Sequence, residues 1–504
     1  MPVTGIALDI GTSGIRALAL DVYEKKTTGC AVTSWHPLPG SNLIDHLLFS
    51  ATFGPIIAQR IIVRTINDLV RELCDPQSIE TMAVCGNTGQ LSLFTGTEIR
   101  DLLMSPASLE RKGILIPDRR ALVVDAGTLG LEVSCDVLVP PAIRAEVGAD
   151  ALALIHKSEM VGKNSVMAVD LGTNAEMALS ANGKIYVGSA AAGPAIEGQH
   201  IRHGMLAAPG AIAGITYDWG WTLQVLDNTL CTVQGNTIDL GPGTIRRQGH
   251  VKAKGITGTG VIALVSAGLT KGIISPPHIH APGAILSLQD GISFTEQDLI
   301  EAGKAFGAIR AGQLTLAEVA GVPLETIHTC HIAGTAGSFA DPLRARDVGI
   351  IPSSAGSIIR HGNTSLEMAA DLATGTEQLE TLQRIADEAE HVAFSGSRIF
   401  SDHFIHELAY WCEGAPRHRM MPVYPDPVIV QSPSKWIAES MKFTRPDYRV
   451  PIPEGTARWE LILQTCPNHA IAIRNESIEI DLRVCQGSSC LQCHRAGLLF
   501  GSPV

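Results

Sequence analysis

The feature that most constrains the fold of this chain is a turn that occurs twice, about 160 residues apart. An apolar strand that contains Asp9 leads into the turn Gly11-Thr12-Ser13-Gly14, and a second apolar strand follows. The pattern recurs where a strand that contains Asp170 leads into Gly172-Thr173-Asn174. A single copy is typical of any strand end, but two copies at domain-scale spacing predict duplicated lobes, each contributing one hairpin loop to a shared cleft.

Both turns have the composition of a phosphate-binding loop. Glycines and small hydroxyl residues let backbone N–H groups point inward with no side chain in the way. A carboxylate directly before such a turn is better placed to hold Mg²⁺ through water than to contact phosphate, so we expect Asp9 and Asp170 at the metal. The sequence contains no G-x-x-x-x-G-K-S/T motif and no strand-led G-x-G-x-x-G. P-loop and dinucleotide-binding folds are therefore not indicated, and ATP with Mg²⁺ is the expected cofactor pair.

Other segments give predictions about local structure. Helices are expected over 55–75, 142–160 and 294–320, the last one amphipathic and opened by a Thr295 cap with Asp298 three residues on. A buried strand over 328–333 runs into Gly334-Thr335-Ala336-Gly337, which offers close backbone approach for a purine and ribose or, alternatively, an ordinary helix start. The aromatic run Tyr217–Trp221 favours core packing over a cofactor platform.

Composition limits the class of protein. Of the 504 residues, 45% are hydrophobic and 17% charged, and 50 are glycine, as in compact α/β domains. The net charge of −12 disfavours nucleic acid and anionic membranes as partners. The sequence shows no signal peptide and no apolar run long enough to span a bilayer, so we expect a soluble, cytoplasmic protein.

Four cysteines near the C-terminus have the spacing of metal ligands. Cys485, Cys490 and Cys493 form a C-x4-C-x2-C run, and Cys466 stands 19 residues upstream, directly before a proline. In two-cluster ferredoxins a cysteine before proline completes the ligand set of a cluster, and the residues over 470–481 resemble the hairpin that joins such ligands. We expect one [4Fe-4S] cluster, with a four-cysteine zinc site or unligated thiols as the alternatives.

The stretch from Val166 to Ile212 carries a family resemblance. Its segments Val169–Glu176, Ala191–Gly198 and Gly204–Ile212 are similar to the ATP-dependent reductive activators of corrinoid proteins. Shorter matches occur in the same order, among them Gly255–Gly260 and Ile332–Gly334, and the resemblance covers roughly residues 4–400. The start and size of the chain also resemble the methanogenesis marker 14 proteins.

The resemblance implies a fold and a set of domains. The fold is α/β, with two ribonuclease-H-like lobes as in actin, sugar kinases and heat-shock chaperones, followed by a ferredoxin-like cysteine-rich module. The implied domains are a first ATPase lobe (1–162), a second lobe (163–400), a linker or docking segment (401–440) and an iron–sulfur module (441–504). Longer members of the family carry a plant-type ferredoxin domain ahead of the matching region, so the resemblance does not predict how electrons enter this protein. Their adenosine segment ends Gly-Gly-Phe-Gly where this sequence has Gly334-Thr335-Ala336-Gly337, so the resemblance does not predict the affinity for nucleotide either.

The resemblance also implies a function and its residues. ATP hydrolysis drives reduction of a metal centre in a corrinoid protein, or in another methanogenesis metalloprotein, with electrons that pass from an external donor through the C-terminal cluster. Within this scheme Glu197 orients the attacking water, while Gly258, Gly260, Gly334, Thr335 and Gly337 contact the nucleotide. A small-molecule kinase and a nucleotide-switched assembly factor with structural zinc are the alternatives, and the lobes are able to form a homodimer.

Overall fold

The computed structural model describes residues 4–40, 42–172, 174–191, 200–228, 230–417, 424–437, 441–444, 446, 449–451, 463, 471–474 and 477–480. The chain forms two compact units, and each unit is assembled from separate stretches of sequence. The first unit contains Met1–Ala153, Ser365–Asp387 and Ser434–Val504, and the second contains Leu154–Thr364 and Glu388–Pro433. Within the described residues, no helix is both long and apolar enough to cross a membrane.

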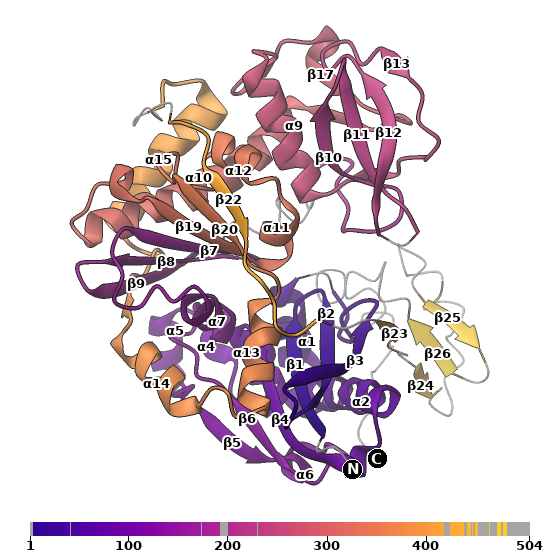
Figure 1. Ribbon diagram of the computed structural model, residues 1–504, viewed down its shortest axis with the longest axis vertical. Coiled ribbons are helices and arrows are strands. Elements are labelled where there is room, and N and C mark those ends of the chain that lie inside the picture. Colours follow the sequence, from indigo (N-terminus) through magenta and orange to yellow (C-terminus); the bar gives the residue numbers. More distant parts are fainter. Residues whose placement is uncertain are drawn as a thin grey trace. The chain divides into compact units, whose positions relative to one another are not determined.

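The first unit is built on a seven-stranded sheet with the order β23-β3-β2-β1-β4-β6-β5 (Figure 1). Its strands are β1 (Thr4–Gly11), β2 (Gly14–Asp21), β3 (Lys26–Thr33), β4 (Ile79–Gly86), β5 (Leu122–Asp125), β6 (Asp136–Val139) and β23 (Lys442–Thr444). Strands β1, β2 and β3 form consecutive antiparallel hairpins, and β1 pairs in parallel with β4, which pairs in parallel with β6. Strand β1 is buried on both faces, which explains its nearly unbroken apolar sequence.

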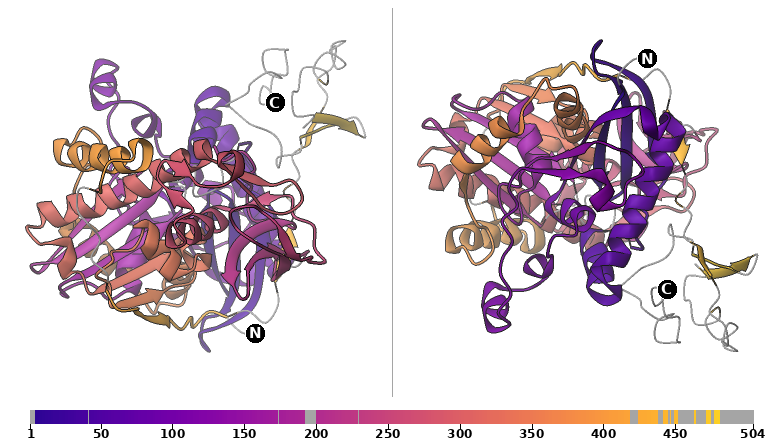
Figure 2. Two further views of the ribbon diagram at one scale, coloured as in Figure 1. Left: turned by 90° about the horizontal axis from the view of Figure 1, so that it is seen from above. Right: turned by 90° about the horizontal axis from the view of Figure 1, so that it is seen from below.

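Helices surround the first sheet. They are α1 (Leu43–Phe53), α2 (Pro55–Leu73), α3 (Thr88–Thr95), α4 (Arg100–Leu103), α5 (Pro106–Arg111), α6 (Ala126–Leu129), α7 (Ala149–Lys157), α13 (Thr364–Ala373) and α14 (Leu379–Glu388). The predicted helix over 55–75 is confirmed as α2, which packs against β2 and β3 (Figures 1 and 2). The helix predicted over 142–160 is confirmed only in the central part of that range, because α7 spans Ala149–Lys157.

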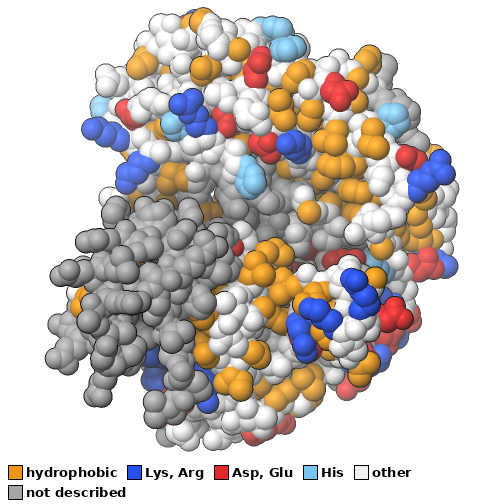
Figure 3. Space-filling model, turned by 180° about the vertical axis from the view of Figure 1, so that it is seen from behind, with side chains coloured by type: hydrophobic (Ala, Val, Ile, Leu, Met, Phe, Trp, Pro, Cys, Tyr) orange, Lys and Arg blue, Asp and Glu red, His pale blue; other side chains and the backbone are white. Residues whose placement is uncertain are grey.

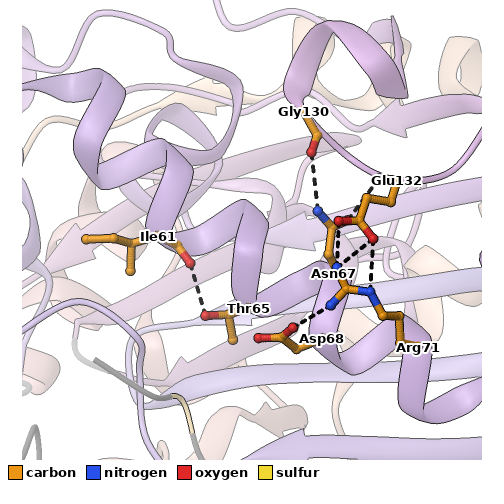
Figure 4. A network of polar contacts seen from close by, with 7 residues as sticks. All are labelled: Ile61, Thr65, Asn67, Asp68, Arg71, Gly130 and Glu132. Carbon is orange, nitrogen blue, oxygen red and sulfur yellow. Dashed lines mark hydrogen bonds and ion pairs between the residues drawn. The ribbon is translucent and has the colours of Figure 1, made fainter. Parts of the chain in front are cut away.

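Polar contacts attach α2 to the loop that follows α6 (Figure 4). Asn67 donates from Nδ2 to the Gly130 carbonyl at 3.2 Å and accepts from the Glu132 N–H at 3.0 Å. Arg71 adds ion pairs to Glu132 and Asp68 at the exposed end of the helix. Because the amide of Asn67 satisfies two backbone groups of the loop, it fixes the helix relative to the β5–β6 edge of this sheet.

The second unit contains a sheet with the order β21-β9-β8-β7-β19-β20-β22. Its strands are β7 (Val166–Leu171), β8 (Ala175–Ala181), β9 (Lys184–Ala190), β19 (Thr329–Ala333), β20 (Ser357–Arg360), β21 (Glu390–His391) and β22 (Val428–Gln431). Strands β7, β8 and β9 form antiparallel hairpins, and β7, β19 and β20 pair in parallel. The run β9-β8-β7-β19-β20 thus repeats β3-β2-β1-β4-β6 of the first sheet, which confirms the predicted pair of ribonuclease-H-like, actin-type lobes.

The helices of the second unit are α9 (Gly258–Thr270), α10 (Glu296–Val319), α11 (Gly334–Phe339), α12 (Pro342–Val348) and α15 (Arg398–Glu413). The predicted capping box of α10 is confirmed, with the Asp298 N–H donating to Thr295 Oγ1 at 3.2 Å and the Thr295 N–H donating to Asp298 Oδ2 at 2.8 Å. The amphipathic prediction was wrong, because α10 packs against β8 and β9 and also against α15, which buries most of its circumference.

A smaller sheet in the second unit has the order β13-β12-β11-β10-β14. Its strands are β10 (Ala211–Tyr217), β11 (Trp221–Leu226), β12 (Thr232–Ile238), β13 (Ile245–Arg247) and β14 (Gly255–Ile256), and α9 packs against β10 (Figure 1). Two short hairpins follow, β15 (Ile274–Ser275) with β16 (His278–Ile279), and β17 (Ile285–Ser287) with β18 (Ser293–Thr295).

Three short strands lie in the C-terminal part of the sequence. β24 (Arg449–Pro451), β25 (Ile471–Arg474) and β26 (Ser477–Ile480) form a sheet in which β26 is central. The hairpin expected over 470–481 is confirmed by the antiparallel pairing of β25 with β26. Cys466, Cys485, Cys490 and Cys493 lie outside the described residues, so the ferredoxin-like module around this hairpin stays a prediction.

Candidate functional site

The turn between β1 and β2 is fixed by side chains from two other elements of the first unit. Thr33 Oγ1 accepts a hydrogen bond from the Ile15 N–H at 2.9 Å, and a Cβ on Gly14 would lie only 2.8 Å from that oxygen. Thr12 Oγ1 accepts from Asn87 Nδ2 at 3.2 Å. The sequence did not indicate Thr33, and it indicated Asn87 only as part of the short family match Cys85–Thr88, without a role, since both contacts join residues that are distant along the chain.

Asp9 lies at the end of β1 and is buried beside an arginine. Arg16 stands directly opposite it in the hairpin, and Arg16 Nη1 is 3.1 Å from Asp9 Oδ2. A Cβ on Gly11 would lie 3.3 Å from the same Nη1, so the guanidinium lies next to the turn. Arg16 is partly exposed and has five N–H donors, which leaves donors for a phosphate oxygen. Arg16 was not among the predicted site residues, although its place in the second strand is visible in the sequence.

A second carboxylate, Asp150, lies near Asp9 at the start of α7. Burial raises the pKa of Asp150 to about 6, and the negative charge of Asp9 adds to the rise. Cys85 pairs with Asp9 in the parallel register of β1 and β4. Burial raises the pKa of the Cys85 thiol well above its ordinary value, and the negative charges of Asp9 and Asp150 raise it further. A Cβ on Gly148 would lie 2.7 Å from the Thr88 nitrogen, so glycine lets the start of α7 approach the start of α3. Two carboxylates therefore lie beside the first turn.

The turn after β7 has a different electrostatic character. It is closed by a hydrogen bond from the Gly172 N–H to the Asn174 carbonyl at 3.0 Å. Asp170 pairs across the hairpin with Glu176, and both side chains are buried. Directly opposite side chains of an antiparallel pair have Cβ atoms roughly 5 Å apart, so two acidic groups lie close together at the second turn, whereas at the first turn Arg16 offsets the charge of Asp9. This site suits a divalent cation better than the first one.

Gly334, the first residue of α11, packs directly against the carboxylate of Asp170. A Cβ at this position would lie 2.3 Å from Asp170 Oδ1 and 2.6 Å from the Leu171 carbonyl oxygen, and its φ is +83°. Gly337 follows on the same helix, where a Cβ would lie 3.7 Å from Leu171 Cβ. The predicted glycine-rich segment thus lies next to the second turn, and its contact with a purine stays a prediction.

We expect Gly334→Ala to weaken Mg·ATP binding and to lower the free energy of unfolding by about 1–3 kcal/mol, because the methyl group displaces Asp170 and the positive φ is strained. Isothermal titration with Mg·ATP and urea unfolding measure the two effects. Gly321→Ala is the matched control, since Gly321 has φ +68° and no atom within 4 Å of its Cβ position. If the two variants bind Mg·ATP with the same affinity, the close contact of Gly334 with Asp170 is not required for nucleotide binding.

The two other predicted glycines have a packing role in the second unit. Thr257 caps α9 by accepting from the Gly260 N–H at 3.1 Å, and a Cβ on Gly260 would lie 2.3 Å from the Ile212 carbonyl oxygen. Gly258 is the first residue of the same helix and is buried. Glycine at position 260 therefore lets α9 lie against β10, and nucleotide contact by Gly258 and Gly260 stays a prediction.

Some predicted site residues cannot be placed. Thr173 and Glu197 lie outside the described residues, and the described part of Thr335 is limited to its backbone in α11. The described geometry therefore consists of two glycine turns, each preceded by a buried aspartate and each fixed by distant residues. Each turn by itself has backbone N–H groups that are able to bind phosphate and a carboxylate that is able to hold a cation.

The sequence matches two family models that together cover residues 4–421. Residues 4–163 match the RACo middle region, and residues 164–421 match the C-terminal domain of RACo, the ASKHA domain. A similar curated protein is the "[Co(II) methylated amine-specific corrinoid protein] reductase" of Methanosarcina barkeri, 40% identical over 422 residues, which are 82% of this chain and 78% of that protein.

Two further relatives are more distant. The "Corrinoid activation enzyme RamQ" of Eubacterium limosum is 24% identical over 406 residues, covering 71% of this chain and 62% of that protein. A solved structure named "Reductive activator for corrinoid, iron-sulfur protein" is 23% identical with a TM-score of 0.63, covering 81% of this chain and 66% of that one. The structural likeness supports the fold.

Proposed function

Because this chain belongs to the RACo family of corrinoid activators, we propose that it reduces the cobalt of a corrinoid protein from Co(II) to Co(I) in an ATP-dependent reaction. Each turnover adds one electron to cobalt, taken from an external one-electron donor, while ATP is hydrolysed to ADP and phosphate. The observation that carries the proposal is the duplicated turn, with a buried aspartate at each strand end, inside a region 40% identical to a corrinoid protein reductase.

The residues of the two turns have different proposed tasks. The backbone N–H groups of Gly11–Gly14 and Gly172–Asn174 bind the phosphates, and Arg16 adds a positive charge beside the first turn. Asp170 holds Mg²⁺ with support from Glu176, because two buried carboxylates favour a divalent cation. Asp9 is already paired with Arg16, so its part in holding the metal is through water. A bound Mg²⁺ would supply positive charge next to the phosphate oxygens.

Two acidic residues are the candidates for orienting the attacking water. Glu197 has this role by family resemblance, while Asp150 is supported by its position beside the first turn and next to Asp9. The contact of α7 with α3 through Gly148 gives Asp150 a fixed place. We therefore assign Asp150 as a base that orients the water, and substitution of each residue in turn distinguishes the two.

Electron delivery is proposed to use the four C-terminal cysteines. Four thiolates are the usual donor set of a [4Fe-4S] cluster, and Cys466, Cys485, Cys490 and Cys493 flank the hairpin formed by β25 and β26. Such a cluster supplies one-electron transfer at low potential. The remaining parts of the proposal are a cytoplasmic location, a corrinoid protein of a methanogenic methyltransferase system as partner, and an optional homodimer.

The activity is tested with a methylated-amine-specific corrinoid protein in its Co(II) form, Ti(III) citrate as electron donor, and Mg·ATP. We expect loss of the Co(II) EPR signal and appearance of Co(I) absorbance only when ATP and the protein are both present. Replacing ATP by ADP is the control. Reduction that is equally fast without ATP, or absent with it, would contradict the proposed function.

The cluster is tested separately by iron, sulfide and zinc analysis after anaerobic purification. We expect about four irons per chain and a reduced-cluster EPR signal that is lost in Cys490→Ser and in Cys466→Ser. Cys231→Ser is the matched control, because Cys231 is an exposed thiol elsewhere in the chain. Stoichiometric zinc without iron would instead support a structural metal site and remove the internal electron carrier from the proposal.

A further inference from the structure

The hairpin between β10 and β11 presents two aromatic side chains to solvent. Trp219, at the tip, is 87% exposed and Tyr217 is 58% exposed, while Trp221 on the next strand is 6% exposed. The prediction of core packing for this aromatic run is therefore correct for Trp221 and wrong for the other two. Two exposed aromatic side chains on one hairpin contribute little to the free energy of folding, and aromatic residues are enriched at protein interfaces relative to the rest of the surface.

The tip is a fixed structure. Trp219 has φ +56°, a left-handed conformation that is strained for an L-residue with a bulky side chain. The turn is nevertheless closed by a hydrogen bond from the Asp218 N–H to the Gly220 carbonyl at 2.9 Å, and Arg246 Nη1 donates to the Trp219 carbonyl at 3.3 Å. Arg246 is itself held by an ion pair to Asp239 at 2.6 Å. The turn, held by these contacts, thus presents the indole ring to solvent.

Tyr217 is held in a similar way. Its ring lies 5.0 Å from the ring of Trp221, measured between centroids, and Lys271 Nζ lies 4.8 Å from its centroid. Lys271 follows the last residue of α9, so a cation–π contact joins the end of this helix to the hairpin. The ring of Tyr217 is therefore held by Trp221 and lies next to the positive charge of Lys271.

The segment that contains the tip has a small positive charge, in contrast to the whole chain. Residues 211–271 contain five lysines and arginines, three aspartates and no glutamate, whereas the chain has a net charge of −12. Arg247, on β13, is exposed and donates to Gln234 of the neighbouring strand at 2.9 Å. In Figure 3, Lys and Arg side chains lie among Asp, Glu and His side chains at the upper left, the side on which this small sheet lies in that view. A small positive charge in this segment, on a protein that is acidic as a whole, favours encounter with an acidic partner.

We propose that this aromatic tip, defined as Tyr217, Trp219, Arg246, Arg247 and Lys271, is the surface on which the corrinoid protein docks. The inference rests on the proposed function and adds the chemistry of the contact: an acidic surface around an apolar pocket that receives the indole of Trp219. Tryptophan, tyrosine and arginine are the residues that most often dominate the energy of protein interfaces. A second copy of this chain is a poorer occupant, since a symmetric contact would bring the same basic groups together.

The test uses Trp219→Gly, which removes the indole and also relieves the positive φ, because glycine adopts this conformation without strain. We expect the thermal midpoint of the isolated protein not to fall, because the relieved strain offsets the added freedom of glycine in the unfolded chain, and its ATP hydrolysis to stay unchanged. The affinity for the Co(II) methylated-amine-specific corrinoid protein is expected to fall about 10- to 100-fold, measured by isothermal titration. Lys271→Glu and Arg247→Glu are expected to weaken binding at low salt and to have little effect at high salt.

Tyr23→Ala is the matched control, because Tyr23 is also a highly exposed aromatic residue, in the loop between β2 and β3 of the first unit. This variant is expected to bind like the unaltered protein. Unchanged affinity and unchanged cobalt reduction in Trp219→Gly would overturn the docking surface while leaving the proposed function intact. If the unaltered protein neither binds nor reduces the corrinoid protein, both proposals are overturned. Trp219-dependent binding to nucleic acid or to a second copy in place of the corrinoid protein would also overturn this one.

Discussion

Asp150→Asn is expected to lower kcat for ATP hydrolysis roughly 100- to 10,000-fold, the range that a positioned general base contributes. The substitution keeps the shape of the side chain and removes its ability to accept a proton from water. Binding of Mg·ATP is expected to be retained, because the proposed phosphate and metal contacts belong to the two turns. Steady-state hydrolysis in the presence of the corrinoid protein, together with nucleotide titration, measures both quantities.

Two further variants make the assignment specific. Asp118→Asn changes an exposed carboxylate of the first unit and is expected to leave kcat unchanged. Glu197→Gln tests the residue that family resemblance favours. If Glu197→Gln loses hydrolysis while Asp150→Asn keeps it, Glu197 orients the water and Asp150 has a structural or electrostatic role only.

A large loss of stability is expected under mildly acidic conditions, because the protein buries several neutral histidines. His331 Nδ1 and His361 Nε2 are 2.8 Å apart, so only one proton fits between the two rings. Burial lowers the pKa of each to about 4, and the positive charges of Lys163 and Lys157 add to this effect for His331 and His361 respectively. Protonating both rings in the folded state would bring two N–H groups face to face.

A second histidine pair lies in the first unit. The Leu38 N–H donates to His36 Nδ1 at 3.1 Å, so His36 donates from Nε2 to Gln90 Oε1 at 3.0 Å. Gln90 Nε2 in turn donates to His46 Nδ1 at 2.8 Å, and the two imidazole rings stack with centroids 3.9 Å apart. Burial lowers the pKa of His36 to about 3 and that of His46 well below its ordinary value. Protonation of His36 would turn its acceptor nitrogen into a donor that faces another donor.

The sign of the pH effect follows from these lowered pKa values. The unfolded chain takes up protons as pH falls below about 6.5, while the folded chain does not until about pH 4, so stability decreases across this window. Between about pH 7.5 and pH 5.5 each buried histidine contributes a loss of about 1.3 kcal/mol, or about 5 kcal/mol for four. Urea unfolding followed by tryptophan fluorescence at the two pH values measures the difference.

The double variant His331→Asn, His361→Asn is expected to be less stable at neutral pH and to show a smaller pH dependence. His280→Gln, which alters an exposed histidine, is expected to keep the full pH dependence. A stability that does not change between the two pH values would mean that these rings already carry protons in the folded state or remain accessible to solvent.

Features encoded by neighbouring residues could be predicted from the sequence. The two Asp–Gly turns, the helix at 55–73, the capping box of Thr295 and Asp298, and the hairpin over 471–480 all depend on residues close together in the chain. The repeat also predicted the shared topology of the two large sheets, because each begins with the same hairpin. Local propensity and periodicity decide such elements.

Contacts between distant segments could not be predicted in this way. The approach of Asp150 to Asp9 depends on Gly148 packing against the start of α3, and Gly334 reaches Asp170 only because β19 pairs with β7. Burial also reversed one prediction: α10 has a helical pattern of polar residues, yet α15 covers the face that was expected to meet solvent. The assembly of each unit from separate stretches has no local signal at all.

Strand β23 has a consequence for synthesis of the protein on the ribosome. It completes the first sheet by pairing in parallel with β3, yet the two strands are separated by about 400 residues, which take roughly 20–80 s to translate at about 5–20 residues per second. During that time the nascent chain presents β3 as an unpaired edge, the kind of surface on which chains aggregate. Chaperones that act on nascent chains, and expression at reduced temperature, are therefore expected to increase the yield of folded protein.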